Sequence, residues 1–234
     1  MKNDFVIGVL GGMGTYATIN LFTEYANVFK AVKEWDRPRI IIDNRCTMPS
    51  RVRAYLYNEK VDELVNEMSE SMDYLTKAGA TKVILACMTS HLFLPKIYEK
   101  VPALEGKVLN LIENCARKIN EDNIKEVYLL GSEGTIDSKI FQNELAKYGI
   151  TCNVPTEDDY VILRDVIEAV KQDNYTSETK EKFLSLVSRS KYVILGCTEL
   201  PILYNRYIDG IKIEKAYDPL KLALEELKKE YENE

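Results

Sequence analysis

Two near-identical phrases, each with a cysteine at the same point, constrain this chain more than any other feature. Residues 83–89 read VILACMT and residues 193–199 read VILGCTE. Each is a short apolar, β-branched run that stops at a small residue and a thiol, a pattern typical of a buried strand that ends in a turn. Two glycine-containing phrases precede them, LGGMGT at 10–15 and LGSEGT at 130–135. The repetition predicts two homologous units that each carry one thiol.

Strand and helix patterns alternate along the chain, which predicts an α/β fold with mainly parallel sheets. We expect a first lobe from residues 1–105 together with 215–234, and a second lobe from residues 106–214. The expected strands are 5–10, 39–43, 81–86, 127–130, 150–153 and 192–196, and the expected helices are 16–30, 58–77, 138–147, 158–170, 178–188 and 219–232.

The two cysteines are placed where a parallel sheet binds its ligands, at the carboxyl ends of strands. If the lobes face each other, both glycine turns and both thiols converge on one cleft. Inverting a carbon requires a base on one face and an acid on the other, and Cys87 and Cys197 can alternate in those roles. The amides of a following helix favour a thiolate, and we expect Thr89, Ser90 or Thr198 to cap that helix.

Composition excludes several other classes of protein. The five cysteines are an odd number and are irregularly spaced, which argues for reduced thiols, and we interpret Cys46, Cys115 and Cys152 as structural. No C-x-x-C pair occurs and His91 is the single histidine, so we expect no zinc or other metal site.

The formal net charge of −6 argues against a nucleic-acid partner. No apolar run approaches the roughly 20 residues that span a bilayer, so we expect no membrane partner. The first residues lack the layout of a cleavable signal, and we expect a cytoplasmic location. The GGMG turn lacks the spacing of a nucleotide-binding loop.

The motifs GGMGTYAT at 11–18, ACMTSH at 86–91 and GCTELP at 196–201 resemble those of the cofactor-independent aspartate/glutamate racemase family. The resemblance extends across essentially the whole chain and includes the N-x-x-x-x-P-x-R stretch from Asn44 to Arg51. It implies two lobes related by pseudo-twofold symmetry, with the paired cysteines across the cleft between them. It also implies no pyridoxal phosphate or metal, and a homodimer.

The resemblance suggests roles for further residues. Arg51 matches the family position that binds a carboxylate, and its planar fork suits that group. Arg164 lies on a helix where relatives tend to carry a basic residue. His91 is either a proton relay to Cys87 or a structural residue, and both readings stay open. The candidate substrate-binding residues are Met13, Gly14, Asn44, Arg51, Thr89, Arg164, Thr198 and Glu199.

The chain also departs from the family pattern. Met88 stands where the family usually has asparagine, and Thr15 where proline commonly follows the glycine turn. The prediction is an amino-acid racemase that inverts aspartate or glutamate without a cofactor, with the choice of substrate open. The alternatives are a related cysteine isomerase or decarboxylase acting on a small dicarboxylate, and a non-catalytic protein that binds such a ligand.

Overall fold

The computed structural model describes residues 4–233 and forms two compact units. The first runs to Leu111 and resumes at Leu220, and the second runs from Ile112 to Pro219. Both boundaries lie later than the sequence suggested. Residues 106–111 stay with the first unit because Val108 bridges to Val83 in parallel. Residues 215–217, expected in the first lobe, form a strand of the second sheet.

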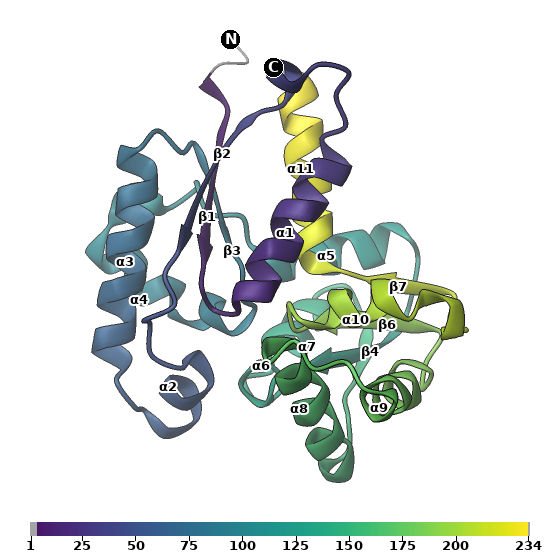
Figure 1. Ribbon diagram of the computed structural model, residues 1–234. Coiled ribbons are helices and arrows are strands. Elements are labelled where there is room, and N and C mark those ends of the chain that lie inside the picture. The colour runs from purple at the N-terminus through teal and green to yellow at the C-terminus, as the bar shows by residue number, and fades with distance from the viewer. Residues whose placement is uncertain (1–3, 234) are drawn as a thin grey trace. The chain divides into compact units, whose positions relative to one another are not determined.

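The first unit is built on a three-stranded parallel sheet in the order β2-β1-β3. All six residues of the central strand β1 are buried, because helices cover both faces of the sheet. Figure 1 shows α1 and α11 beside one face and α3 and α4 beside the other. The elements are β1 Val6–Gly11, α1 Thr15–Val28, β2 Arg39–Asn44, α2 Arg51–Tyr57, α3 Val61–Lys77, β3 Lys82–Leu85, α4 Leu94–Lys100 and α11 Pro219–Asn233, with short 3₁₀ turns η2 Glu34–Asp36, η3 Thr89–Phe93 and η4 Pro102–Leu104.

The helix expected over residues 58–77 is α3, which begins three residues later at Val61, and the short helix α2, which the sequence did not suggest, precedes it. Asn58 and Lys60 have positive φ angles of 54° and 51°, so the backbone leaves the right-handed helical region between them. Asn58 caps the end of α2 in this left-handed conformation. The apolar side of α3 then packs on the sheet in one core cluster, which includes Leu64, Val65, Met68, Met72 and Leu75.

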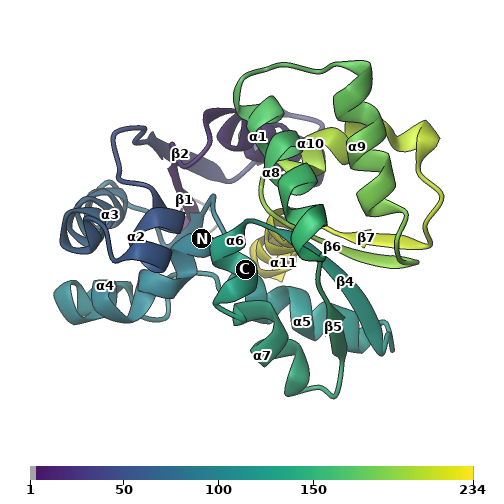
Figure 2. The same cartoon turned by 90° about the horizontal axis from the view of Figure 1, so that it is seen from below.

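The second unit is built on a four-stranded parallel sheet in the order β5-β4-β6-β7. Figure 2 shows α5 and α7 beside one face of this sheet and α8, α9 and α10 beside the other. The elements are α5 Leu111–Glu121, β4 Glu126–Gly131, α6 Glu133–Asp137, α7 Ile140–Ala146, β5 Thr151–Asn153, α8 Glu157–Lys171, α9 Ser177–Val187, β6 Tyr192–Gly196, α10 Leu200–Arg206, η5 Ile208–Gly210 and β7 Lys215–Tyr217. Parallel sheets flanked by helices confirm the α/β prediction.

The two sheets repeat one layout. The order β2-β1-β3 in the first unit corresponds to β5-β4-β6 in the second. In the first sheet Leu10 pairs with Leu85, and in the second Leu130 pairs with Leu195. Each predicted catalytic cysteine comes two residues after the paired leucine of the later strand. The second sheet differs by its additional strand, β7.

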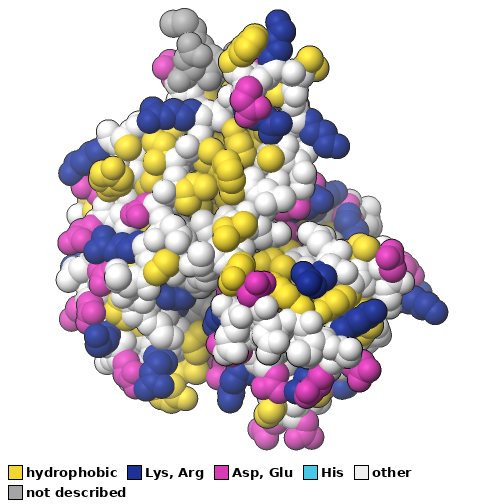
Figure 3. Space-filling view, in the orientation of Figure 1, with side chains coloured by type: hydrophobic (Ala, Val, Ile, Leu, Met, Phe, Trp, Pro, Cys, Tyr) yellow, Lys and Arg dark blue, Asp and Glu magenta, His cyan; other side chains and the backbone are white. Residues whose placement is uncertain are grey.

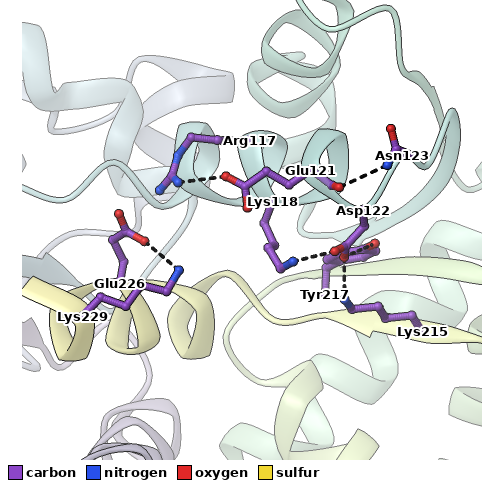
Figure 4. Close-up of polar contacts among 9 residues, drawn as sticks. All are labelled: Arg117, Lys118, Glu121, Asp122, Asn123, Lys215, Tyr217, Glu226 and Lys229. Carbon is purple, nitrogen blue, oxygen red and sulfur yellow. Dashed lines mark hydrogen bonds and ion pairs between the residues drawn. The ribbon is translucent and has the colours of Figure 1, made fainter.

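An acidic residue at the end of α5 holds β7 in place. Asp122 accepts hydrogen bonds from the ammonium groups of Lys118 and Lys215 and from the hydroxyl of Tyr217, the last at 2.9 Å (Figure 4). Burial alone would raise the pKa of Asp122, but these donors outweigh it and hold the pKa at about 2. The carboxylate is therefore ionised and ties both ends of β7 to α5.

The surface of the first unit has an apolar region around α1. Ile19 and Phe22 on α1 are about half exposed, and Trp35 in η2 is 77% exposed. Figure 3 shows apolar side chains gathered at the surface in the part of the view where α1 and β2 lie. Across residues 4–233, every helix is too short or too polar to cross a bilayer.

Candidate active site

The first thiol lies immediately beyond β3. The amide of Ala86 donates to the carbonyl of Leu10 at 2.9 Å and extends the ladder by one residue, and Cys87 follows with its side chain half-buried. The chain then turns into η3, and the hydroxyl of Ser90 donates to the Cys87 carbonyl at 2.6 Å. This turn fixes the backbone that carries the thiol.

The His91 side chain stabilises the same turn through contacts with backbone atoms. The Leu111 amide donates to His91 Nε2 at 3.4 Å, so Nδ1 carries the proton and faces the carbonyls of Cys87 and Met88 at 3.1 and 3.2 Å. Burial lowers the pKa of His91 to about 4, although the carbonyl contacts oppose the shift. The ring is neutral and contacts backbone atoms on both sides. These contacts indicate a structural role for His91 rather than a proton relay.

The second thiol lies immediately beyond β6 and has a carboxylate partner. Cys197 Sγ donates to Glu199 Oε2 at 3.0 Å, and the Thr198 hydroxyl donates to the same oxygen at 3.3 Å. Glu199 is 2% exposed, and its other oxygen, Oε1, has no hydrogen-bond partner among the residues described. Oε2 of Glu199 therefore accepts the hydrogen bond of the Cys197 thiol, and Oε1 remains without a donor in the described part of the chain.

The caps of the two following helices differ from the expectation. Met88 and Glu199 occupy the cap positions of η3 and α10, and neither side chain caps its helix. Thr89 and Thr198, the expected caps, are both buried. Glu199 cannot cap α10 because its carboxylate is turned toward Cys197.

A lysine that the sequence analysis missed accompanies the second thiol. Lys171 ends α8, one residue beyond the helix expected at 158–170. Burial lowers its pKa, but the hydrogen bond to Glu168 and the charges of Glu199 and Cys197 outweigh burial and raise it. Lys171 is a basic residue in the last turn of α8, where a cation is favoured. The sequence would have indicated it if the expected helix had extended one residue further.

Arg164 lies at the same edge of the second sheet as Cys197, and its charge is paired. Its guanidinium contacts Glu133, the first residue of α6, which follows β4. The Arg164 side chain is 60% exposed. The structure therefore places Arg164 near the carboxyl end of β4, together with an acidic partner that the sequence analysis did not name.

Arg51 and the first glycine turn are brought together. Arg51 Nη2 donates to the Met13 carbonyl at 2.9 Å, and Nη1 donates to the Pro49 carbonyl at 3.1 Å. Its Nε is buried and has no hydrogen-bond partner within the described part of the chain. The N-terminus of α2 carries this arginine, with Ser50 accepting from the Arg53 amide as the cap. Arg51 is thus a fixed cation beside the turn.

The two glycine phrases fold differently. Gly12 has a φ of +77°, and a Cβ there would lie 2.3 Å from the Arg45 carbonyl carbon, so the first turn requires glycine. Gly14 follows as the residue that precedes α1. In the second unit the expected turn at Gly134 lies inside α6, and Ser132 caps that helix by accepting from the Thr135 amide at 3.4 Å. The second phrase is a capped helix start because serine replaces the second glycine.

Asn44 contacts a third thiol. At the end of β2, Asn44 Nδ2 donates to Cys46 Sγ at 3.2 Å, and the Thr15 hydroxyl lies 3.3 Å from the same sulfur. Cys46 is exposed, unlike Cys115, which is buried. Cys46 was interpreted as structural from the sequence, and the structure places it beyond the carboxyl end of β2, beside the candidate substrate-binding residue Asn44.

Each unit therefore presents a motif cysteine and at least one cation at the carboxyl edge of its sheet. The first combines Cys87 with Arg51 and the glycine turn, and the second combines Cys197 with Lys171 and Glu199. Such groups can exchange a proton with carbon and bind a carboxylate. Between residues 4 and 233, no three histidine, cysteine, aspartate or glutamate side chains are grouped so that they could hold a metal ion.

The fold resembles solved structures of amino-acid racemases. Aspartate racemase of Picrophilus torridus is 24% identical, with a TM-score of 0.83 over 97% of this chain and 94% of that one. An aspartate racemase homologue of Pyrococcus horikoshii OT3 is 21% identical, with a TM-score of 0.75 over 99% and 100%. Glutamate racemase of Francisella tularensis subsp. tularensis SCHU S4 is 16% identical, with a TM-score of 0.69 over 100% and 83%. At these identities the likeness shows the shared fold.

Family membership follows from the sequence itself. An uncharacterised protein of Pectobacterium carotovorum subsp. carotovorum is 26% identical over 107 residues, which cover 44% of this chain and 71% of that protein. The family model described as Asp/Glu/Hydantoin racemase matches residues 10–227, which include both cysteine motifs and the first glycine turn. This match confirms the resemblance inferred from the motifs, and the chain belongs to the Asp/Glu/Hydantoin racemase family.

Proposed function

We propose that the protein is an amino-acid racemase that inverts the α-carbon of aspartate or glutamate, with Cys87 and Cys197 as its two acid–base groups. One observation carries the proposal. Both thiols are partly exposed and follow equivalent strands of the two repeated sheets, two residues beyond the paired leucines. Family membership supports the racemase, and therefore isomerase, character.

The reaction requires one thiolate and one thiol. The thiolate takes the proton from the α-carbon and becomes a thiol, which leaves a carbanion on the substrate. The opposite thiol then donates its proton to the other face of that carbon and becomes a thiolate. No net proton is gained or lost, and the two cysteines exchange protonation states with each turnover. When the enzyme next converts a molecule that has the product's configuration, the proton moves in the opposite direction and each cysteine returns to its original protonation state.

The anchors for the substrate are the cations next to the two thiols. Arg51 is held by two backbone carbonyls, which carry no net charge, so its positive charge is available to a carboxylate. Lys171 supplies a second positive charge near Cys197. Aspartate and glutamate carry two carboxylates, which matches one cation from each unit. Glu199 Oε1, which lacks a partner among residues 4–233, can accept from the substrate ammonium.

The unequal surroundings of the thiols favour one alternative. Cys197 donates from its thiol to a carboxylate, whereas Cys87 accepts hydrogen bonds from Ser90 and His91 through its backbone carbonyl. A single activated cysteine is the arrangement that an isomerase or decarboxylase of a small dicarboxylate uses. Under this alternative, replacing Cys87 leaves much of the activity, whereas replacing Cys197 removes it.

Deuterium exchange tests the proposal directly. We expect purified protein in deuterium oxide to convert L-aspartate or L-glutamate to the D-enantiomer, with deuterium at the α-carbon of the product. Mass spectrometry and chiral chromatography measure both quantities. If neither amino acid exchanges its α-proton or changes configuration, the racemase proposal is wrong. Turnover of maleate or malonate under the same conditions then identifies the alternative.

A further inference from the structure

A hollow of about 790 Å³ opens at the end of the second sheet that is opposite to Cys197. It is lined by residues at the starts of β4 and β6, among them Glu126 and Tyr192, whereas Cys197 follows the end of β6. The five residues of β6 span roughly 17 Å at the usual strand rise of about 3.3 Å. The hollow is therefore separate from the candidate active site.

An ion pair between a buried carboxylate and a half-exposed arginine forms one wall of the hollow. Asp159 is 3% exposed, and its two oxygens accept from Arg189 Nη2 at 2.6 Å and from the Thr156 hydroxyl at 3.0 Å. Both carboxylate oxygens are thus occupied. Arg189 is held in one orientation by this contact, while its side chain stays 46% exposed. Its remaining N–H groups have no partner among residues 4–233 and are available to a ligand.

A buried phenol faces the same wall. Tyr128 is 7% exposed and lines the hollow, and its hydroxyl makes no hydrogen bond to any residue the structure describes. Burial raises the pKa of the Tyr128 hydroxyl, and the charge of Asp159 raises it further, while the charge of Arg189 lowers it. The hydroxyl therefore lies within the field of that ion pair. The phenol is therefore a protonated donor. The hydroxyl is not among the buried unpartnered groups of the described chain, so it reaches the surface of the hollow and can donate to a ligand there.

Further basic groups surround these two donors. The ammonium of Lys125 makes no ion pair with a residue in the described range, and Lys191 pairs with Glu214 at 2.8 Å while remaining 77% exposed. Glu126, the other acidic residue of the lining, accepts from Asn153 Nδ2 at 2.6 Å. Among the described residues of the lining, Lys125 is thus a cation and Glu126 a carboxylate without an ion-pair partner, and Arg189 and Tyr128 contribute free donors.

We propose that this hollow, formed by Tyr128, Asp159, Arg189 and Lys125, is a second ligand site that binds the phosphate group of a small phosphate ester. A phosphate dianion has three terminal oxygens, which match the fork of Arg189, the ammonium of Lys125 and the hydroxyl of Tyr128. The volume lies within the range of small-molecule sites, about 300–1,000 Å³, and exceeds what inorganic phosphate fills. The ester therefore carries a group of the size of a sugar.

Calorimetric titration with ribose 5-phosphate, ribose and inorganic phosphate tests the proposal. We expect ribose 5-phosphate to bind, inorganic phosphate to bind more weakly and ribose not to bind. Tyr128→Phe removes one hydroxyl with little change of shape, and should weaken binding of the ester about threefold to tenfold. Arg189→Lys keeps a cation beside Asp159 but loses the fork, and should weaken it about tenfold or more.

Stability measurements distinguish a ligand site from a merely structural tyrosine. Because the Tyr128 hydroxyl has no protein partner, Tyr128→Phe should leave the melting temperature without ligand unchanged or raised, while reducing the increase caused by ribose 5-phosphate. Tyr74→Phe and Lys212→Met, at exposed positions outside the hollow, are matched controls that should leave binding unchanged.

Two results would overturn the proposal. One is the absence of heat and of any melting shift with both phosphate-containing probes at millimolar concentration. The other is binding that Tyr128→Phe and Arg189→Lys leave unaltered, which indicates an adventitious ion only. The site does not depend on the racemase proposal, since Cys197→Ser should leave ribose 5-phosphate binding intact even if the protein has no racemase activity.

Discussion

Cys87 and Cys197 occupy equivalent positions in two repeated sheets, but the residues around them differ. Two positions after Cys197 stands Glu199, whose carboxylate accepts from the thiol at 3.0 Å. Four positions after Cys87 stands His91, whose neutral ring supports the turn, and the corresponding residue after Cys197 is Pro201. The backbone layout of the repeat is retained while the side chains have diverged. Each half therefore presents its thiol through a different set of contacts.

The turns that begin the two halves diverge in the same way. In the first, Gly12 brings the backbone against Arg45, and the Thr18 hydroxyl accepts from the Gly12 amide at 3.1 Å. In the second, Ser132 caps a helix and no left-handed residue is needed. The first half thus presents a tightly packed backbone turn beside Arg51, and the second presents Glu133 beside Arg164.

The largest expected effect comes from removing each thiol in turn. Under a two-base mechanism, Cys87→Ser and Cys197→Ser should each reduce racemisation by about a hundredfold to ten-thousandfold, because each removes one proton carrier. Steady-state rates in both directions measure this. Cys152→Ser, at a half-buried thiol on β5, is the control that should retain activity. A large loss in Cys197→Ser with little in Cys87→Ser would show that the halves are not functionally equivalent.

The histidine that only the first half contains should make stability depend on pH. His91 has a pKa of about 4 when folded, against about 6.5 when unfolded, so the unfolded chain binds the proton first as pH falls. Stability should therefore decrease between pH 6.5 and pH 4, by about 3 kcal/mol. Urea unfolding of wild type and His91→Gln across this range measures it. Parallel pH profiles for the two proteins would contradict the assignment.

Matched glycines at the ends of β1 and β4 should respond unequally to an added methyl group. A Cβ on Gly11 would lie 2.6 Å from Thr18, whose hydroxyl is engaged with the turn, whereas the nearest atom to a Cβ on Gly131 is 3.3 Å away. Gly11→Ala should cost about 2 kcal/mol of unfolding free energy, and Gly131→Ala less than about 1 kcal/mol. Denaturant titrations compare them. Equal costs would indicate that the first turn is less tightly packed than the structure shows.

The smallest expected effect concerns the carboxylate that only the second thiol contacts. Glu199→Gln keeps the size of the side chain but removes the charge beside Cys197, and kcat should fall about tenfold, or about 1.4 kcal/mol. Glu178→Gln, at an exposed position on α9, is the control. Unchanged kcat in Glu199→Gln would mean that Cys87 and Cys197 behave alike in spite of their different neighbours.

Local patterns predicted most of the elements and failed at identifiable places. The strands with buried β-branched runs, such as β1 and β6, were predicted to within one residue. The strand β7 was missed because three residues of mixed polarity, Lys215–Tyr217, carry no strand pattern, and contacts with Asp122 hold it in place. The short helix α2 was missed, and the helix expected from residue 58 begins only at Val61 because Asn58 and Lys60 have left-handed backbone.

The sequence by itself determined that two strand-and-thiol units repeat in this chain, because periodicity and duplication are properties of neighbouring residues. It also led to the family, through motifs that are continuous in the chain. Only the tertiary structure decided which groups meet: Arg51 with Met13, Arg164 with Glu133, and His91 with Leu111. These partners are separated by 20 or more residues, and their contacts depend on how helices pack on each sheet and how each side chain is oriented.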